Sequence, residues 1–76
     1  MKKILLPELG EGINEAVVSL WHFLEGDSVA ASDDIVEIVT DKAAFNVPSG
    51  VSGKIKKIIH PEGDTVKVGD ALAELE

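Results

Sequence analysis

The chain lacks cysteine, arginine and tyrosine, and its only aromatic residues are one tryptophan and two phenylalanines. Without cysteine, neither a disulfide nor a thiolate metal site can brace the fold, and any redox sulfur must come from outside the chain. Without arginine, seven lysines face fourteen carboxylates, which leaves a net charge of −7. This charge repels phosphate backbones, so the composition argues against nucleic-acid binding and favours a partner with a basic surface.

Long apolar runs are also missing. Lys2 and Lys3 are followed only by the apolar residues 4–6 before Pro7 interrupts the run. Such a run is too short for a secretory signal or a membrane span, so we expect a soluble, intracellular protein without a membrane partner. The 76 residues make one domain, residues 1–76, in which a single small core leaves little stability to spare.

The segments rich in β-branched and aromatic residues predict strands joined by turns. These segments are residues 2–6, 16–24, 28–30, 35–40, 43–47 and 54–59. In the segment 43–47, Phe45 and Val47 share one face while Asn46 takes the other, as in a half-buried strand. Residues 8–15 hold two glycines and three acids without any period, which predicts a loop.

An internal repeat relates the two halves of the chain. A shift of 37 residues lays residues 25–38 on residues 62–75, with six identical positions of fourteen. Chance alone would give about one, given ordinary residue frequencies. We therefore expect two similar halves packed about a pseudo-twofold axis, in a flattened barrel of short, mostly antiparallel strands.

The same shift predicts a bulge in each half. It places Val18 on Ile55 and Trp21 on Ile58, and a spacing of three breaks strict alternation if these residues all face inward. Trp21 is expected inside, because so small a domain needs its few aromatics in the core. The alternative is an exposed Trp21 used for binding.

The centre of the chain predicts a hairpin with a lysine at its tip. Two strand-forming runs meet at Asp41 and Lys42 with no Gly or Pro between them, so ordinary residues must make the tight turn. Shifting residues 40–42 back by 37 lands on residues 3–5, so the twofold is expected to set the tip opposite the chain ends. Lys42 is then either a solvated turn residue or an amine held out for use.

These features together resemble the lipoyl domains of 2-oxo acid dehydrogenase complexes, specifically those of the dihydrolipoamide acyltransferase component. The resemblance covers the whole chain. It implies an all-β barrel-sandwich hybrid, in which two four-stranded antiparallel sheets are related by pseudo-twofold symmetry. The matching motifs are Leu6-Pro7-Glu8-Leu9-Gly10-Glu11-Gly12, Trp21, Glu25-Gly26-Asp27, Asp41-Lys42-Ala43, Val51-Ser52-Gly53, Glu62-Gly63-Asp64 and Val68-Gly69.

By this resemblance Lys42, flanked by Asp41 and Ala43, carries lipoic acid in amide linkage, and the chemistry lies in the dithiolane. The implied partners are a lipoate-attaching ligase or transferase, a thiamin-diphosphate-dependent decarboxylase, an acyltransferase core and dihydrolipoamide dehydrogenase. The isolated domain would be a monomer, located in the bacterial cytoplasm or the mitochondrial matrix. Two alternatives are a biotin carrier, in which methionines flank the lysine, and an unmodified interaction module of the same fold.

The resemblance also implies that the loop over residues 8–14 lies beside the lysine and helps select the decarboxylase. Glu8, Glu11 and Glu15 are candidate partner contacts, together with Thr40; the alternative is a solvated acidic loop. Val39 stands where many members of the family have an acid, which suggests a difference in partner specificity.

No other constellation predicts chemistry. His22 and His60 are not paired by the repeat, and neither has companions for a metal site or a catalytic triad. The aspartates 33, 34, 64 and 70 stand in turns, where such residues favour local backbone bonding. The acyltransferase signature of His with a downstream Asp-Gly is absent, so we expect a non-catalytic carrier segment cut from a longer acyltransferase chain.

Overall fold

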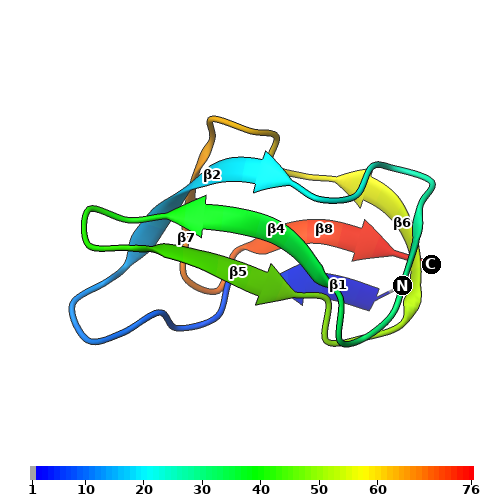
Figure 1. Ribbon diagram of the computed structural model, residues 1–76, viewed down its shortest axis with the longest axis horizontal. Helices are drawn as coiled ribbons and strands as arrows, with labels where there is room; N and C mark the ends of the chain where they lie inside the picture. The colour runs from blue at the N-terminus through cyan, green and yellow to red at the C-terminus, as the bar shows by residue number, and fades with distance from the viewer. Residues whose placement is uncertain (1) are drawn as a thin grey trace.

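The structure, a computed structural model, describes residues 2–76, which fold into eight strands in two four-stranded sheets (Figure 1). The strand orders are β1-β8-β6-β3 and β5-β4-β2-β7, and every pairing within them is antiparallel. The predicted all-β architecture of two four-stranded sheets is therefore confirmed. The strands are β1 (Lys2–Leu5), β2 (Glu15–Trp21), β3 (Ser28–Val29), β4 (Asp34–Val39), β5 (Ala44–Pro48), β6 (Gly53–Ile58), β7 (Thr65–Lys67) and β8 (Ala71–Leu75).

Strand β2 ends earlier than the predicted segment 16–24. The backbone N–H of Leu24 donates to Oδ2 of Asp27 at 2.9 Å, and the N–H of Asp27 donates to the Leu24 carbonyl at 3.0 Å. These two bonds close a turn, so the apolar residues that follow Trp21 leave the sheet. Apolar composition alone did not show this local competition.

Backbone hydrogen bonds confirm the duplication. The N–H of Gly26 donates to the Ile55 carbonyl, and the N–H of Gly63 donates to the Val18 carbonyl, both at 2.7 Å. The two donors, Gly26 and Gly63, are 37 residues apart, and so are the two acceptors, Val18 and Ile55, as a twofold exchange of the halves requires. The ladders of β2 and β6 also shift register, between Val18 and Leu20 and between Ile55 and Lys57, which confirms the predicted bulges.

The offset of 37 does not extend to β1. In the pairing of β1 with β8, Ile4 lies opposite Ala73, and in the pairing of β5 with β4, Val47 lies opposite Val36. Val36 and Ala73 are 37 residues apart, whereas Ile4 and Val47 are 43 apart. Residues 3–5 are therefore not the counterparts of residues 40–42, as the simple shift implied. The place that corresponds to the turn lies between the end of β8 and the start of β1.

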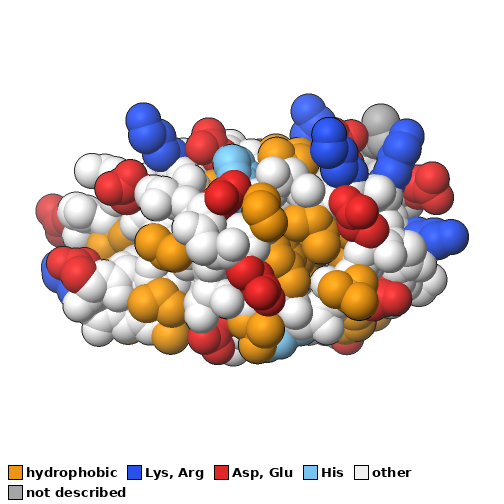
Figure 2. Space-filling view, turned by 90° about the horizontal axis from the view of Figure 1, so that it is seen from above, with side chains coloured by type: hydrophobic (Ala, Val, Ile, Leu, Met, Phe, Trp, Pro, Cys, Tyr) orange, Lys and Arg blue, Asp and Glu red, His pale blue; other side chains and the backbone are white. Residues whose placement is uncertain are grey.

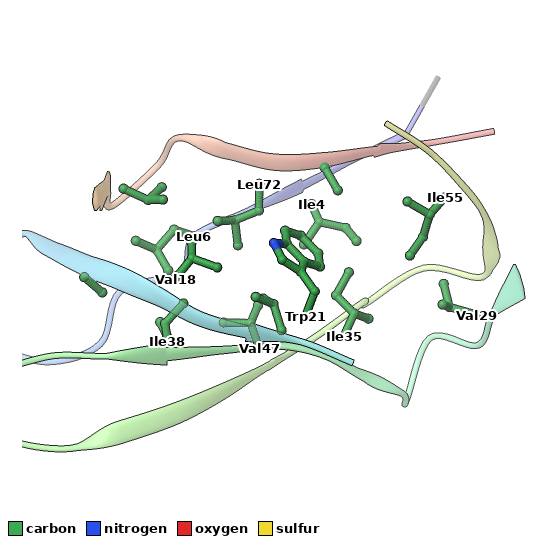
Figure 3. Close-up of a cluster of buried hydrophobic side chains, with 14 of the residues drawn as sticks. Ile4, Leu6, Val18, Trp21, Val29, Ile35, Ile38, Val47, Ile55 and Leu72 are labelled. Atoms are coloured by element: carbon green, nitrogen blue, oxygen red, sulfur yellow. The ribbon is translucent and has the colours of Figure 1, made fainter. Parts of the chain in front are cut away.

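The core lies between the two sheets, and Trp21 is at its centre (Figure 3). Trp21 is 8% exposed, and its Nε1 donates to the His60 carbonyl at 2.8 Å, which satisfies the polar end of the indole. The prediction that Trp21 is internal is confirmed. The other buried hydrophobic residues are Ile4, Leu6, Ala16, Val18, Val29, Ile35, Val36, Ile38, Val47, Ile55, Val66, Leu72, Ala73 and Leu75.

The domain is elongated, with principal extents of 32 × 20 × 17 Å. The β4–β5 hairpin tip lies at one end of the long axis, and both chain ends lie at the other (Figure 1). The predicted separation of the tip from the chain ends is therefore confirmed. Within residues 2–76, no helix has the length and apolar character needed to cross a membrane.

Candidate functional site

The turn from Thr40 to Ala43 joins β4 to β5 without glycine, proline or any positive φ angle. The last rung of the ladder pairs Val39 with Ala44, and the N–H of Thr40 then donates to the Ala43 carbonyl at 2.9 Å. Ordinary residues therefore make the reversal, as predicted, with backbone conformations that cost no left-handed strain.

The hydroxyl of Thr40 holds this turn together. Its Oγ1 accepts hydrogen bonds from the N–H of Lys42 at 3.2 Å and from the N–H of Ala43 at 3.1 Å, and it donates to the Ala43 carbonyl at 3.1 Å. A hydroxyl has one proton and two lone pairs, so the turn uses its full hydrogen-bonding capacity. The sequence placed Thr40 among the partner contacts, which stays a prediction; the bonds within the turn were not foreseen.

The side chain of Lys42 is exposed at the tip, between Asp41 and Ala43, which are exposed as well. Within residues 2–76 its Nζ makes neither a hydrogen bond nor an ion pair, and the single ion pair of this part of the chain joins His60 Nδ1 to Asp64 Oδ2 at 3.3 Å. The amine is therefore accessible on a backbone that is hydrogen-bonded beneath it.

A surface concavity lies beside the tip, and Lys42 lines it together with part of the loop before β2. The loop side is formed by Gly12, with φ +81°, and by residues 13–14, and Glu15, the first residue of β2, follows them. The end of the loop over residues 8–14 therefore lies beside Lys42, and Glu15 shares the concavity with it. Glu8 and Glu11 are exposed on the same loop but do not line the concavity. The partner contacts assigned to all three glutamates remain predictions.

The floor of the concavity comes from the outer face of the β5-β4-β2-β7 sheet. Val17 is 42% exposed and Val39 is 36% exposed, and they are direct cross-strand neighbours. Thr65 of β7 is paired with Val17 and also lines the concavity. Val17 and Thr65 were not among the residues selected from sequence; their outward position in an alternating strand was the signal available.

Neither histidine belongs to a reactive cluster. Nε2 of His22 lies 3.0 Å from Oδ1 of Asn46, while His60 contacts Asp64. No group of three or more His, Asp or Glu side chains in residues 2–76 is arranged to hold a metal ion. Oδ2 of Asp33 accepts from the N–H of Ala30 at 2.9 Å, so this turn aspartate bonds locally as predicted.

Hydrophobic side chains gather near the middle of one long face of the domain (Figure 2). A second depression of the surface lies on the pseudo-twofold axis. Its residues form three pairs that are 37 apart: Trp21 with Ile58, Leu24 with Pro61, and Glu25 with Glu62. Oε2 of each glutamate accepts a backbone N–H, that of Ile58 for Glu25 and that of Trp21 for Glu62. Each carboxylate therefore provides the hydrogen-bond acceptor for one backbone N–H of a bulged strand, β2 or β6.

Comparisons with known proteins agree with this geometry. Residues 2–75 match the profile of the Biotin_lipoyl family, described as "Biotin-requiring enzyme". The chain is 45% identical over 74 residues to a Bartonella vinsonii protein, the dihydrolipoyllysine-residue succinyltransferase component of the 2-oxoglutarate dehydrogenase complex. It is 36% identical over 76 residues to a Bacillus subtilis protein, the lipoamide acyltransferase component of the branched-chain alpha-keto acid dehydrogenase complex. These alignments cover 97% and 100% of this chain but 18% of each relative.

Two solved structures are similar as well. The lipoyl domain of the Azotobacter vinelandii 2-oxoglutarate dehydrogenase complex has a TM-score of 0.77 and 36% identity, and the match covers 100% of this chain and 96% of that one. The urea carboxylase of Kluyveromyces lactis has a TM-score of 0.79 and 30% identity over 97% of this chain and 6% of that one. The match to nearly the entire Azotobacter domain, with a lysine at the hairpin tip, shows that the chain belongs to the biotinyl and lipoyl domain family, and within it to the lipoyl domains.

Proposed function

We propose that Lys42 is the attachment point of lipoic acid and that the domain carries this group between the active sites of a 2-oxo acid dehydrogenase complex. The observation that supports this most directly is the free amine of Lys42, exposed at the pole opposite the chain ends. The family profile, which matches almost the whole chain, supports a covalently attached carrier group, and the match to a solved lipoyl domain supports lipoic acid as that group.

The surroundings of Lys42 fit covalent attachment. The other lysines lie on strands β1, β6 and β7, whereas Lys42 stands in a protruding turn. The Lys2 amine, for comparison, donates to the Ser52 carbonyl at 2.8 Å. A modifying enzyme that docks on the tip therefore meets one lysine with its amine free and its backbone ordered. Selection of one lysine among seven then depends on placement.

Attachment is an amide-forming acyl transfer. The unprotonated Nζ of Lys42 attacks the carbonyl carbon of an activated lipoyl carboxyl; the C–N bond forms, the bond to the activating group breaks, and an Nζ proton leaves to a base. Lipoic acid, when bound, supplies the disulfide that a chain without cysteine lacks. The amide removes the positive charge of Lys42, which leaves Glu15 and Asp41 as the charged groups of the concavity.

Delivery follows from the position of the tip. Both chain ends lie at the far pole, so any flanking segment joins the domain away from Lys42. A tethered domain meets its partners at high effective concentration, which converts slow encounters into fast ones. The partners we propose are the lipoate-attaching enzyme, the thiamin-diphosphate-dependent decarboxylase, the acyltransferase core and dihydrolipoamide dehydrogenase. The domain contributes recognition and delivery, and their active sites contribute the catalysis.

Biotin is the second candidate for the group on Lys42. The family description covers biotin-requiring enzymes, and the fold of the Kluyveromyces urea carboxylase matches this chain with a TM-score of 0.79. Asp41 and Ala43 argue for lipoic acid, because the biotin carriers that this sequence resembles have methionines at these positions.

Intact mass spectrometry separates the candidates. The chain is expressed with lipoate and biotin available and with ligases for both groups active. We expect the mass increment of one lipoyl group, lost in Lys42→Arg, which keeps the charge but cannot be acylated by the same route. A biotin increment would replace our proposal with the second candidate. If the mass stays unmodified although both ligases are active, the domain is an interaction module that carries neither group.

A further inference from the structure

We propose that Thr40 is a positioning residue for the modification of Lys42, acting through the backbone of the turn. This inference rests on the proposed function and adds the residue that makes the lysine recognisable. The two roles differ in how the side chain uses its hydrogen bonds. A residue that contacts a partner needs a free donor or acceptor at the surface, whereas a positioning residue forms its hydrogen bonds inside the turn.

The hydrogen bonds of Thr40 meet the second description. The turn uses the hydroxyl proton and both lone pairs, in bonds of 3.1 Å to the Ala43 carbonyl, 3.2 Å to the N–H of Lys42 and 3.1 Å to the N–H of Ala43. The N–H of Lys42 bonds directly to this hydroxyl, so Thr40 contacts the backbone of the modified residue.

Apart from one backbone bond, from the N–H of Thr40 to the Ala43 carbonyl, no other group orders the tip. The turn has no proline to restrict φ and no glycine to favour a special turn type. The side chains of Asp41, Lys42 and Ala43 are exposed and make no hydrogen bond within residues 2–76. The ladder itself ends one rung below, at Val39 and Ala44. The order of the tip therefore depends on the Thr40 hydroxyl together with the single backbone bond from Thr40 to Ala43.

Loss of the hydroxyl should act on the population of the turn that the ligase recognises. If that conformation is populated only in part, the apparent affinity falls by the same fraction. Thr40→Val keeps the β-branched shape and removes all three hydroxyl bonds. We expect kcat/KM for lipoylation to fall about 5- to 30-fold, mainly through KM, because the side-chain amine and the chemistry are unchanged. Thr40→Ser keeps the hydroxyl and should restore modification to near the wild-type rate.

Ser32→Ala is the control for removal of an exposed hydroxyl. Ser32 lies in the turn before β4, at the end of this strand away from the tip, and its hydroxyl makes no hydrogen bond within the part of the chain that the structure describes. The change should leave modification unchanged.

The experiment has two independent measurements on the unmodified 76-residue chain. Lipoylation by a lipoate ligase with lipoate and ATP is followed by intact mass at several domain concentrations, which separates KM from kcat. Amide hydrogen exchange of Lys42 and Ala43 is followed by NMR. We expect both amides to exchange faster in Thr40→Val than in Thr40→Ser, Ser32→Ala or the wild type.

Two results would overturn the positioning role. One is equal exchange of both amides in the wild type and Thr40→Val, which would mean that the hydroxyl does not order the turn. The other is faster exchange in Thr40→Val together with wild-type lipoylation kinetics, which would mean that the ligase does not need the ordered turn. A wild-type chain that active ligase never modifies would instead overturn the proposed function, and the exchange measurement would still decide whether Thr40 orders the tip.

Discussion

The backbone N–H of Trp21 donates to Oε2 of Glu62 at 3.1 Å across 41 residues of sequence. The twofold-related bond runs from the N–H of Ile58 to Oε2 of Glu25 at 2.8 Å. Each donor lies beyond the part of its strand that pairs with an outer strand, because β7 pairs only with residues 15–17 of β2 and β3 pairs only with residues 53–54 of β6. Each half therefore supplies a carboxylate that accepts a backbone N–H from the other half. The contact between the two halves is stabilised by these hydrogen bonds as well as by the shared core.

Glu62→Ala should destabilise the domain by about 1 kcal/mol, because the partly buried N–H of Trp21 loses its acceptor. In a domain of this size the change corresponds to a Tm lower by about 4–8 °C. Thermal unfolding followed by circular dichroism measures it. Glu62→Gln keeps an acceptor oxygen, so its Tm should fall less. Glu8→Ala lies on the exposed loop, so its Tm should stay almost unchanged. Equal Tm values for Glu62→Ala and Glu8→Ala would show that the bond does not contribute.

Moving the lysine by one residue tests whether position directs modification. In the double variant Lys42→Ala with Ala43→Lys, the amine stays exposed in the same turn but leaves the tip. Lipoylation should be slower by about a hundredfold or more, since a misplacement of about 1 Å can cost that much. Intact mass reports the modification, and circular dichroism checks that the fold survives. Labelling of the moved lysine at the wild-type rate would contradict recognition by position.

Two valines of β4 should respond in opposite ways to the same change. Val39 is 36% exposed and Val36 is fully buried, so Val39→Glu puts its carboxylate in water while Val36→Glu buries it. We expect Val39→Glu to change the free energy of unfolding by no more than about 0.5 kcal/mol. Val36→Glu should lower the free energy of unfolding by about 4 kcal/mol or more, so that most molecules are unfolded.

Urea unfolding of both variants measures this difference. Lipoylation of Val39→Glu should proceed as in the wild type, since the turn begins after this residue. A large loss of stability in Val39→Glu would show that the outer face of β4 is not free. A folded, stable Val36→Glu would contradict the assignment of Val36 to the core.

Gly53 has no room for a side chain, because an added Cβ would lie 2.7 Å from the Glu76 carbonyl oxygen. The contact arises where β6 passes the end of β8, and the N–H of Glu76 donates to the Lys54 carbonyl at 2.9 Å beside it. Gly53→Ala should therefore destabilise the domain by about 1–3 kcal/mol through overpacking. Thermal unfolding measures the change, and Ser52→Ala serves as the control. A Tm equal to that of the control would mean that the chain end moves aside freely.

Local patterns and the repeat were sufficient to predict much of this molecule. Alternation predicted the inward position of Val47, the spacing of Val18 and Trp21 predicted a bulge, and the shift of 37 predicted its twin in β6. The turn at Asp41 and Lys42 was evident because two strand-forming runs met there. These features depend on neighbours in sequence or on identical residues in the two halves, and both can be seen in a linear chain.

Other features depend on contacts between distant segments, which no local pattern records. The shift of 37 failed for β1, because this strand pairs as the counterpart of β5 with an offset of 43. The concavity beside Lys42 joins the loop at Gly12, strand β2 at Val17 and strand β7 at Thr65, and the packing of the two sheets alone brings these together.

The chain order of residues therefore sufficed for the strands, the duplication and the lysine at a turn, because period-two alternation and repeated residues act through near neighbours. Three-dimensional packing decided which groups surround that lysine and how its backbone is held. The Thr40 hydroxyl forms three bonds only when the turn is closed, and the carboxylate of Glu62 reaches the N–H of Trp21 only when the two halves meet. Hydrogen bonds need distance and direction, and folding alone supplies both.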